Sequence, residues 1–183
     1  MTTRTHSPAL SGTSTQFVAP IGASVAYGVI SSPVGELLVL SDGEALTGLY
    51  LDGAAHARSV ESSMVRDDAL FGEVARQLER YFAGEITRFS LALAPSGTAF
   101  QLEVWNALTR IDYGKTISYV ELARRIGRPK ASRAVGSANG RNPISIVVPC
   151  HRVIAADNSL GGYAGGLERK ELLLSLERKV ATS

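Results

Sequence analysis

A length of 183 residues is enough for one large domain or two small ones with a real hydrophobic core. Hydrophobic residues make up 45% of the chain and charged residues 20%, which is usual for globular proteins, and no apolar run approaches the ~18 residues that span a membrane. The single cysteine excludes an internal disulfide and any site built on several thiolates, and it is consistent with a reducing cytoplasm.

The formal net charge of +2 hides an uneven distribution along the chain. Residues 1–99 carry six Lys and Arg against ten Asp and Glu, a balance of −4, whereas residues 100–153 carry nine against three, a balance of +6. A basic block beside an acidic one is typical of a protein whose second half binds a polyanion. Arg-rich helices with merely solvated faces give the same pattern, so charge alone leaves both interpretations open.

The first part of the chain predicts a leader and a small α/β domain over residues 17–94. Residues 1–16 are rich in Ser and Thr and lack the apolar centre of a secretory signal, so we expect a disordered leader. Apolar residues at helical spacing predict a helix over 68–82, which Gly84 ends. Asp42-Gly43 supplies a hairpin turn. Alternating apolar residues predict four strands, at 24–30, 36–40, 45–51 and 88–94.

A Pro-Ser-Gly linker at 95–97 separates this domain from a second, mainly helical domain over residues 98–183. Thr98 with Gln101 forms a capping box that opens one helix, and Ser118 with Glu121 forms another. The second of these helices is short and ends near Gly127, where a further helix follows after the turn. Two short helices joined by a Gly-containing turn predict a helix-turn-helix, and the +6 balance strengthens a DNA-binding interpretation.

The second helix of this pair has almost no side-chain bulk, because it reads ASRAVGSAN from residue 131 to 139. Such a helix can lie against another helix or against the wall of a DNA groove. Packing on the protein's own core explains one bare face and leaves the other unexplained. Arg133 then stands alone on a smooth surface, where a long cation is suited to entering a base stack or a groove.

The only thiol lies in the apolar stretch ISIVVPCHRVI, residues 144–154, which we expect to be a buried strand interrupted by Pro149. Adjacent side chains on a strand point to opposite faces, so Cys150 and His151 meet only if the chain turns or a water relays the proton. Cations at His151 and Arg152 can favour the nucleophilic thiolate, although Arg152 can equally serve as a structural ion-pair partner. A carboxylate must fix the imidazole, and three acids of the last helix are available, namely Glu168, Glu171 and Glu177.

Three interpretations of the thiol stay open at this point. A lone buried cysteine is often inert packing. Metal binding is disfavoured because the three histidines are far apart in sequence and no second thiol exists, so we expect no metal and no cofactor. Nucleophilic chemistry is the third interpretation.

The residues around the thiol carry a family resemblance. Pro149-Cys150-His151-Arg152-Val153, preceded by Asn142-Pro143 and followed by Gly162-Tyr163-Ala164-Gly165-Gly166, resembles the signature of the methylated-DNA–protein-cysteine methyltransferases. The resemblance runs from about residue 100 to 177, and the first hundred residues match only in general layout. It implies a ribonuclease-H-like N-terminal domain with a small sheet and a helix, and a winged-helix-like helix-turn-helix in the C-terminal domain.

The resemblance also implies an activity, the irreversible single-turnover transfer of a methyl or alkyl group from O6-alkylguanine in DNA to the protein. Cys150 matches the alkyl acceptor, and His151 matches the histidine that takes the thiol proton through a water. Glu177 matches the partner of that histidine, and Asn142 matches the residue that ties the helix-turn-helix to the active-site strand and helps to order the water network. O4-alkylthymine is a second candidate substrate.

The expected partner is double-stranded DNA, bound through the minor groove with the target base flipped out. Arg133 matches the arginine that fills the gap, and Tyr119 matches the tyrosine that crowds the 3′ phosphate. Val148 lies where we expect a carbonyl acceptor for a guanine proton. The loop expected to close over the base contains Tyr163, Ala164 and Gly165.

Two departures from the family pattern concern the base pocket. Ala164 stands where some members have serine. Ser145 stands where others have proline or alanine, and because serine is smaller than proline we expect Ser145 to widen the pocket. A cytoplasmic monomer is implied, with no membrane association, and cooperative assembly on DNA is left open. Two rival functions remain, a non-enzymatic helix-turn-helix DNA binder and a Cys-His-Glu hydrolase.

Overall fold

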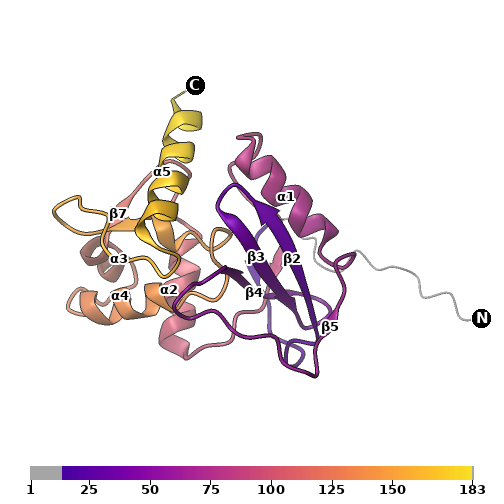
Figure 1. The fold of residues 1–183 in the computed structure, drawn as a ribbon. Helices are drawn as coiled ribbons and strands as arrows, with labels where there is room; N and C mark the ends of the chain where they lie inside the picture. Colours follow the sequence, from indigo (N-terminus) through magenta and orange to yellow (C-terminus); the bar gives the residue numbers. More distant parts are fainter. Residues whose placement is uncertain (1–13, 183) are drawn as a thin grey trace, which may run out of the picture.

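The first half of the chain forms a six-stranded mixed sheet with one helix beside it (Figure 1). This computed structural model describes residues 14–182. Its long strands form an antiparallel meander of β2 (Ala26–Ser32), β3 (Gly35–Ser41) and β4 (Leu46–Leu51). Two-residue strands complete the order β1-β6-β4-β3-β2-β5 in parallel pairings, with β1 at Gln16–Phe17, β5 at Val65–Arg66 and β6 at Ala92–Leu93.

The predicted meander is confirmed, with strand ends within two residues of those expected. The β3–β4 turn lies at Asp42-Gly43, as predicted. Gly43 has a φ of 103°, which a side chain would strain, and Asp42 Oδ1 accepts hydrogen bonds from the backbone N–H groups of Glu44 and Ala45. Local turn chemistry therefore fixes the register of the central strands.

Helix α1 (Gly72–Phe82) starts four residues after the predicted position and is followed by Gly84 at φ 75°. The delay has a local cause, because Asp67 Oδ1 accepts from the Leu70 N–H and holds residues 67–70 as a turn. The strand expected at 88–94 shrinks to β6, although Leu91 and Leu93 are buried in the expected alternation.

The predicted leader overlaps the sheet at its last residue. Gln16 pairs with Ala92 in β1, and Thr15 donates from its hydroxyl to the Phe89 carbonyl at 2.7 Å. The rest of that prediction, residues 1–13, lies outside the described residues. No helix within residues 14–182 is long and apolar enough to cross a membrane.

The second half of the chain is mainly helical, as predicted. Thr98 and Gln101 form the expected reciprocal capping box at the start of α2, and the Ser118 hydroxyl accepts from the Glu121 N–H at the start of α3. The helices are α2 (Ala99–Leu108), α3 (Tyr119–Arg125), α4 (Ser132–Gly140) and α5 (Leu167–Ala181). Two short strands, β7 (Ile117–Ser118) and β8 (Val153–Ile154), pair in parallel.

Helices α3 and α4 form the predicted helix-turn-helix. Gly127, at φ 71°, ends the first helix, and the second begins only at Ser132. Trp105 on α2 is 2% exposed, and its indole N–H donates to the Ala138 carbonyl of α4 at 2.8 Å. The helix-turn-helix is therefore held rigidly against the domain core.

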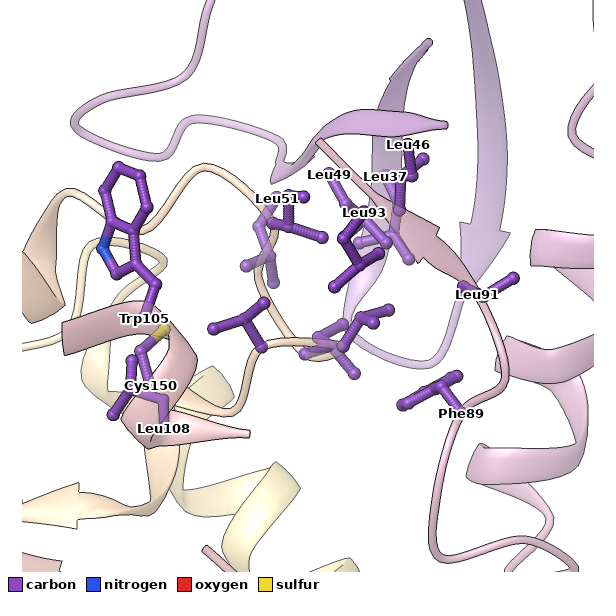
Figure 2. Packing of buried hydrophobic residues seen from close by; sticks show 14 of the residues in the cluster. Leu37, Leu46, Leu49, Leu51, Phe89, Leu91, Leu93, Trp105, Leu108 and Cys150 are labelled. Atoms are coloured by element: carbon purple, nitrogen blue, oxygen red, sulfur yellow. The ribbon is translucent and has the colours of Figure 1, made fainter. Parts of the chain in front are cut away.

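One apolar core runs through both halves of the molecule. Figure 2 shows Trp105, Leu108 and Cys150 on one side of it and the leucines of the sheet on the other. Leu49 of β4 joins them through its backbone, because its N–H donates to the Pro143 carbonyl at 2.8 Å and its carbonyl accepts from the Ser145 N–H at 2.9 Å. The sheet thus anchors the segment that leads to the thiol.

The strand predicted over residues 144–154 is wrong. Up to Pro149, only Ile144 makes a bridge, to Leu49, after which Ile146 takes a φ of 71° and the Val148 N–H bonds back to the Ile144 carbonyl; extended pairing resumes only at Val153–Ile154, in β8. The residues are buried as in a strand, but the positive φ of Ile146 and the missing N–H of Pro149 coil the chain. A one-turn 3₁₀ helix, η1 (Cys150–Arg152), then carries the three functional side chains.

Candidate active site

The thiol of Cys150 lies in the core, 4% exposed, at the start of η1. Asn142 Nδ2 donates to Cys150 Sγ at 3.1 Å, and Asn139 Nδ2 donates to the Cys150 carbonyl at 3.3 Å. Burial raises the pKa of the thiol, while the hydrogen bond from Asn142 and the charge of Lys170 oppose that shift. The thiol is therefore protonated at neutral pH and needs a base before it can act as a nucleophile.

Asn142 follows α4 directly and connects the helix-turn-helix to the thiol. Its Nδ2 also donates to the Val148 carbonyl at 2.8 Å, and its Oδ1 accepts from the Ile144 N–H at 3.0 Å. One buried amide thus holds both ends of the coiled segment 144–148 and touches the sulfur. This position agrees with the expected tying role of Asn142.

His151 lies next to Cys150 in η1 and is fully buried. Its Nε2 lies 2.9 Å from Glu177 Oε1. An ionised carboxylate only accepts hydrogen bonds, so Nε2 carries the hydrogen and Nδ1 of the neutral ring carries the lone pair. Nδ1 is buried and has no hydrogen-bond partner among the described residues, which makes it the atom available to take a proton.

The protonation states of this pair follow from burial and hydrogen bonding. Burial is the largest influence on His151 and lowers its pKa, although Glu177 opposes the shift. Burial also disfavours the charged form of Glu177, but hydrogen bonds from His151 and Arg152 hold the pKa of that carboxyl far below its usual range. The pair therefore consists of a neutral imidazole and a carboxylate at neutral pH.

Glu177, one of the three acids that the sequence left open, is surrounded by donors from three segments, namely η1, α1 and the segment before β7. Arg152 Nε donates to Oε2 at 2.9 Å and Nη2 to Oε1 at 2.8 Å, Tyr81 Oη donates to Oε1 at 2.7 Å, and the Gly114 N–H donates to Oε2 at 3.1 Å. Glu168 and Glu171 are exposed. Arg152 is thus an ion-pair partner of the carboxylate, which is the second of the two roles that the sequence left open for it.

Lys170 is a buried cation whose charge favours the thiolate of Cys150. Its side chain is fully buried, and its Nζ donates to the Val153 carbonyl at 2.6 Å and to the carbonyls of Leu160 and Gly162. Burial lowers its pKa to about 8, although Cys150 opposes that shift. No sequence pattern marked this residue, since a lysine on a helix with mixed charges is usually solvated.

The loop of residues 163–165 lies between the thiol and the sheet domain. The Ala164 carbonyl accepts from the Ala55 N–H at 3.1 Å, and a side chain on Gly165 would come within 2.9 Å of Leu51. Burial and Cys150 raise the pKa of Tyr163 well above its usual range, while Ser145 opposes the shift. This loop is therefore positioned by the N-terminal domain.

Tyr119, the first residue of α3, lies beside the residues that lead into this loop. Its hydroxyl lies 3.4 Å from the Gly162 carbonyl, and its ring lies beside Gly136 of α4 and Gly161, where a Cβ would come within 3.6 Å and 3.3 Å of it. Burial raises the pKa of the phenol, and Cys150 adds to that effect. The structure thus brings Tyr119, Tyr163 and the thiol together.

The outer face of α4 is bare apart from one cation. Val135, Ala138 and Asn139 are buried, whereas Arg133, Ala134 and Ser137 are exposed. Arg133 makes no hydrogen bond or ion pair with the other described residues, whereas Arg124 and Arg125 pair with Glu121, and Arg128 pairs with Glu103. Part of the predicted basic block is thus neutralised internally, and Arg133 is left free.

The expected role of Val148 does not fit the geometry. Its carbonyl accepts from Asn142 Nδ2 and from the Cys150 N–H, both at 2.8 Å, and the residue is fully buried. Both lone pairs of the oxygen are used within the protein, so none is left for a guanine proton. Val148 instead helps to shape the segment before the thiol.

Comparison with known proteins shows the family of this chain. Residues 25–95 match the model of the 6-O-methylguanine DNA methyltransferase ribonuclease-like domain, and residues 99–179 match the model of the DNA-binding domain of the same proteins. The chain belongs to the methylated-DNA–protein-cysteine methyltransferases. The resemblance in the PCHRV segment is thereby confirmed, and the two-domain architecture with it.

Individual relatives of this methyltransferase chain cover most of its length. The methylated-DNA–protein-cysteine methyltransferase of Methanosarcina acetivorans is 52% identical over 82% of this chain and 97% of its own, and that of Haemophilus influenzae is 48% identical over 83% and 86%. The crystal structure of Mycobacterium tuberculosis OGT in complex with DNA superposes with a TM-score of 0.81 at 47% identity, over 85% of this chain and 94% of that chain.

The structure adds three side chains to the methyltransferase site that the sequence did not assign to it: Tyr81, Arg152 in its role beside Glu177, and Lys170. A buried charge needs a partner from another element, and such pairs have no fixed spacing in sequence. Arg152 carried a partial signal through its place in PCHRV. For Tyr81 and Lys170 the sequence contains no such signal.

Proposed function

We propose that this chain repairs DNA by direct reversal and takes the methyl group of O6-methylguanine onto Cys150. The observation that carries the proposal is the unpartnered Nδ1 of His151, fixed by Glu177 beside a protonated thiol to which Asn142 donates. This arrangement is suited to converting the protonated Cys150 thiol to a thiolate, with His151 as the base. The relatives named as methylated-DNA–protein-cysteine methyltransferases support the same reaction.

The reaction needs a single displacement. His151 Nδ1 takes the thiol proton through one water, and the thiolate attacks the methyl carbon. The new S–C bond takes the place of the C–O6 bond, whose electron pair returns to the base, and the proton that His151 took from the thiol passes to the base to complete guanine. The protein ends as an S-methyl thioether, which no group in the site reverses, so each chain acts once.

DNA binding is assigned to the exposed face of α4. A helix with alanine and serine outward can enter the minor groove closely, and the free Arg133 fills the gap left by the flipped base. Flipping costs roughly a few kcal/mol and least for a badly paired base, so an inserted cation offsets much of it. We assign the strands β7 and β8 with the loop after them to the wing of a winged helix-turn-helix.

The flipped base is placed between Tyr119 and the loop of residues 163–165. Tyr119 crowds the 3′ phosphate and donates a hydrogen bond to the base, and Tyr163 closes over it. The backbone N–H groups of Ala164 and Gly165 replace the hydroxyl that some family members have there. Ser145, whose N–H donates to Leu49, leaves more room for larger adducts than a proline would.

The remaining parts of the proposal concern partners and substrates. The chain acts as a monomer on duplex DNA in the cytoplasm, with O4-alkylthymine as a second substrate. Cooperative assembly along the DNA is a separate property that a binding isotherm on long duplexes measures.

A titration distinguishes this function from its two rivals. Duplex carrying one O6-methylguanine is mixed with increasing protein, and restored guanine is counted. We expect one restored base per chain and no more. Turnover beyond one per chain indicates a hydrolase, and binding without restored guanine indicates a non-enzymatic DNA binder.

A further inference from the structure

One contact to the Glu177 carboxylate comes from the other domain. Tyr81, on α1 beside the sheet, donates its hydroxyl to Glu177 Oε1 at 2.7 Å. Both side chains are fully buried, so no solvent competes for this bond. The N-terminal domain therefore reaches the site with a side chain as well as with the backbone of Leu49.

The oxygen that Tyr81 contacts is the one that faces the imidazole. Glu177 Oε1 accepts from His151 Nε2 at 2.9 Å and from the Tyr81 hydroxyl at 2.7 Å. Arg152 Nη2 also donates to this oxygen, at 2.8 Å. Each donor to a carboxylate stabilises its charged form and lowers its basicity, so donors that share one oxygen weaken one another. The phenol therefore limits how strongly Glu177 can stabilise a protonated His151.

The ring of Tyr81 is held in place by aromatic neighbours. Its centroid lies 5.3 Å from Phe82, 5.2 Å from Phe89 and 5.8 Å from Tyr113, two of these in edge-on geometry. A fully buried ring packed on three sides cannot swing away from the carboxylate. The hydroxyl is thus a fixed part of the site.

We infer that Tyr81 is a positioning residue through which the N-terminal domain sets the basicity of His151, by way of Glu177 Oε1. The inference rests on the proposed methyl transfer only for its kinetic consequence. Without the phenol, Oε1 gives more of its charge to His151 Nε2–H, and the imidazole holds its proton more tightly. A protonated His151 cannot take the thiol proton, so transfer fails at a higher pH than in the wild type.

The other groups around His151 and Glu177 are unchanged when the Tyr81 hydroxyl is removed. They set the pKa of His151 from which the shift is measured. Burial and the positive charges near His151 favour the neutral ring, and Glu177 opposes them. The charged and titratable neighbours, from η1, α5 and the segment before β7, are Cys150, Arg152, Lys170 and Tyr113.

The test is Tyr81→Phe, which keeps the ring and removes only the hydroxyl. We expect the acid limb of single-turnover methyl transfer to move up by about half to one pH unit, with the rate above the limb within about threefold of wild type. Titration of the His151 ring by NMR in the free protein should show the same upward shift, and this second readout does not depend on any DNA reaction.

Tyr113→Phe is the matched control, because the Tyr113 hydroxyl is buried in the same aromatic cluster and has no hydrogen-bond partner among the described residues. Its acid limb should coincide with that of the wild type. Coincident limbs and His151 titrations in both variants would overturn the inference, and so would a downward shift in Tyr81→Phe. An absence of transfer in the wild type would instead contradict the proposed function, while the NMR titration would still decide the role of Tyr81.

Discussion

The two halves of the molecule bury different kinds of side chain. The core of the sheet domain is mainly apolar, with Leu37 and Leu40 of β3 and the leucines of β4 at 0–1% exposure, although the acid Asp42 of the β3–β4 turn is also buried there. The C-terminal half buries a histidine, an arginine, a lysine and a glutamate, all at 6% exposure or less. Burying charges costs several kcal/mol each unless partners and hydrogen bonds compensate, so this half gives up stability to hold a site.

The difference shows what each half contributes. Apolar packing makes the sheet domain a rigid support, and its contribution to stability changes little with pH. The buried polar cluster supplies a base, its carboxylate partner and a cation, and its contribution depends on protonation. Changes to the cluster should therefore alter chemistry and pH dependence, which changes to the apolar core should not.

The largest effect is expected for Cys150→Ala. Methyl transfer from duplex O6-methylguanine should disappear, because no other thiol exists in the chain. Affinity for the duplex should stay within about twofold, since phosphate contacts supply most of it. A radiolabelled methyl transfer assay and a binding titration measure the two quantities, and residual transfer in the variant would contradict the assignment of Cys150.

Glu177→Gln should damage both stability and chemistry. The change leaves Arg152 buried without its counter-charge and removes the group that fixes His151, so we expect a loss of about 3–5 kcal/mol in the free energy of unfolding. Transfer should slow by about 100-fold, as for the loss of a general base. Urea unfolding and single-turnover kinetics measure these effects. Glu171→Gln, an exposed acid on the same helix, is the control and should change neither.

Acid should remove the stabilising effect of Glu177. The folded-state pKa of this carboxyl is lowered, so its contribution is complete above the unfolded pKa of about 4.3 and is lost as pH falls toward the folded pKa. Burial also lowers the folded pKa of His151, whose contribution is complete above the unfolded pKa of about 6.5 and lost below it.

Urea unfolding of the wild type and of Glu177→Gln at a series of pH values tests this. The difference in free energy between the two proteins should shrink below about pH 4.3. A difference that stays constant down to pH 3.5 would show that the carboxyl is not held ionised by the cluster.

Arg133→Ala should have the smallest effect on the protein and a selective effect on repair. Repair of duplex should slow by about tenfold, because part of the cost of flipping is no longer offset. Reaction with free O6-methylguanine base needs no flipping and should keep its rate. Arg141→Ala, at the far end of α4, is the control. Equal losses on duplex and free base would give Arg133 another role.

The apolar half of the fold was largely predictable from the sequence. Alternating residues and the Asp42-Gly43 turn predicted β2, β3 and β4, and caps at Thr98 and Ser118 predicted α2 and α3. These signals are local, so a single sequence contains them. The first residue of α1 was displaced because Asp67 makes a turn that competes with the helix.

The polar half was predictable only in part. The sequence pattern indicated Cys150 and His151, and the resemblance added Asn142 and selected Glu177 among three acids. The coiled path of residues 144–148 was missed because its β-branched residues are buried as they would be in a strand. The contact between Tyr81 and Glu177 joins residues 96 positions apart, and no local pattern encodes it.

The central claim is that Cys150 itself receives the methyl group, and peptide mass spectrometry tests it most directly. The protein is incubated with duplex carrying O6-methylguanine, digested and analysed. We predict a stable gain of one methyl group in place of one hydrogen on the peptide that contains Cys150, in every chain when the duplex is in excess. An unmodified Cys150 peptide alongside repaired DNA, or a methyl group on any other residue, would contradict the account.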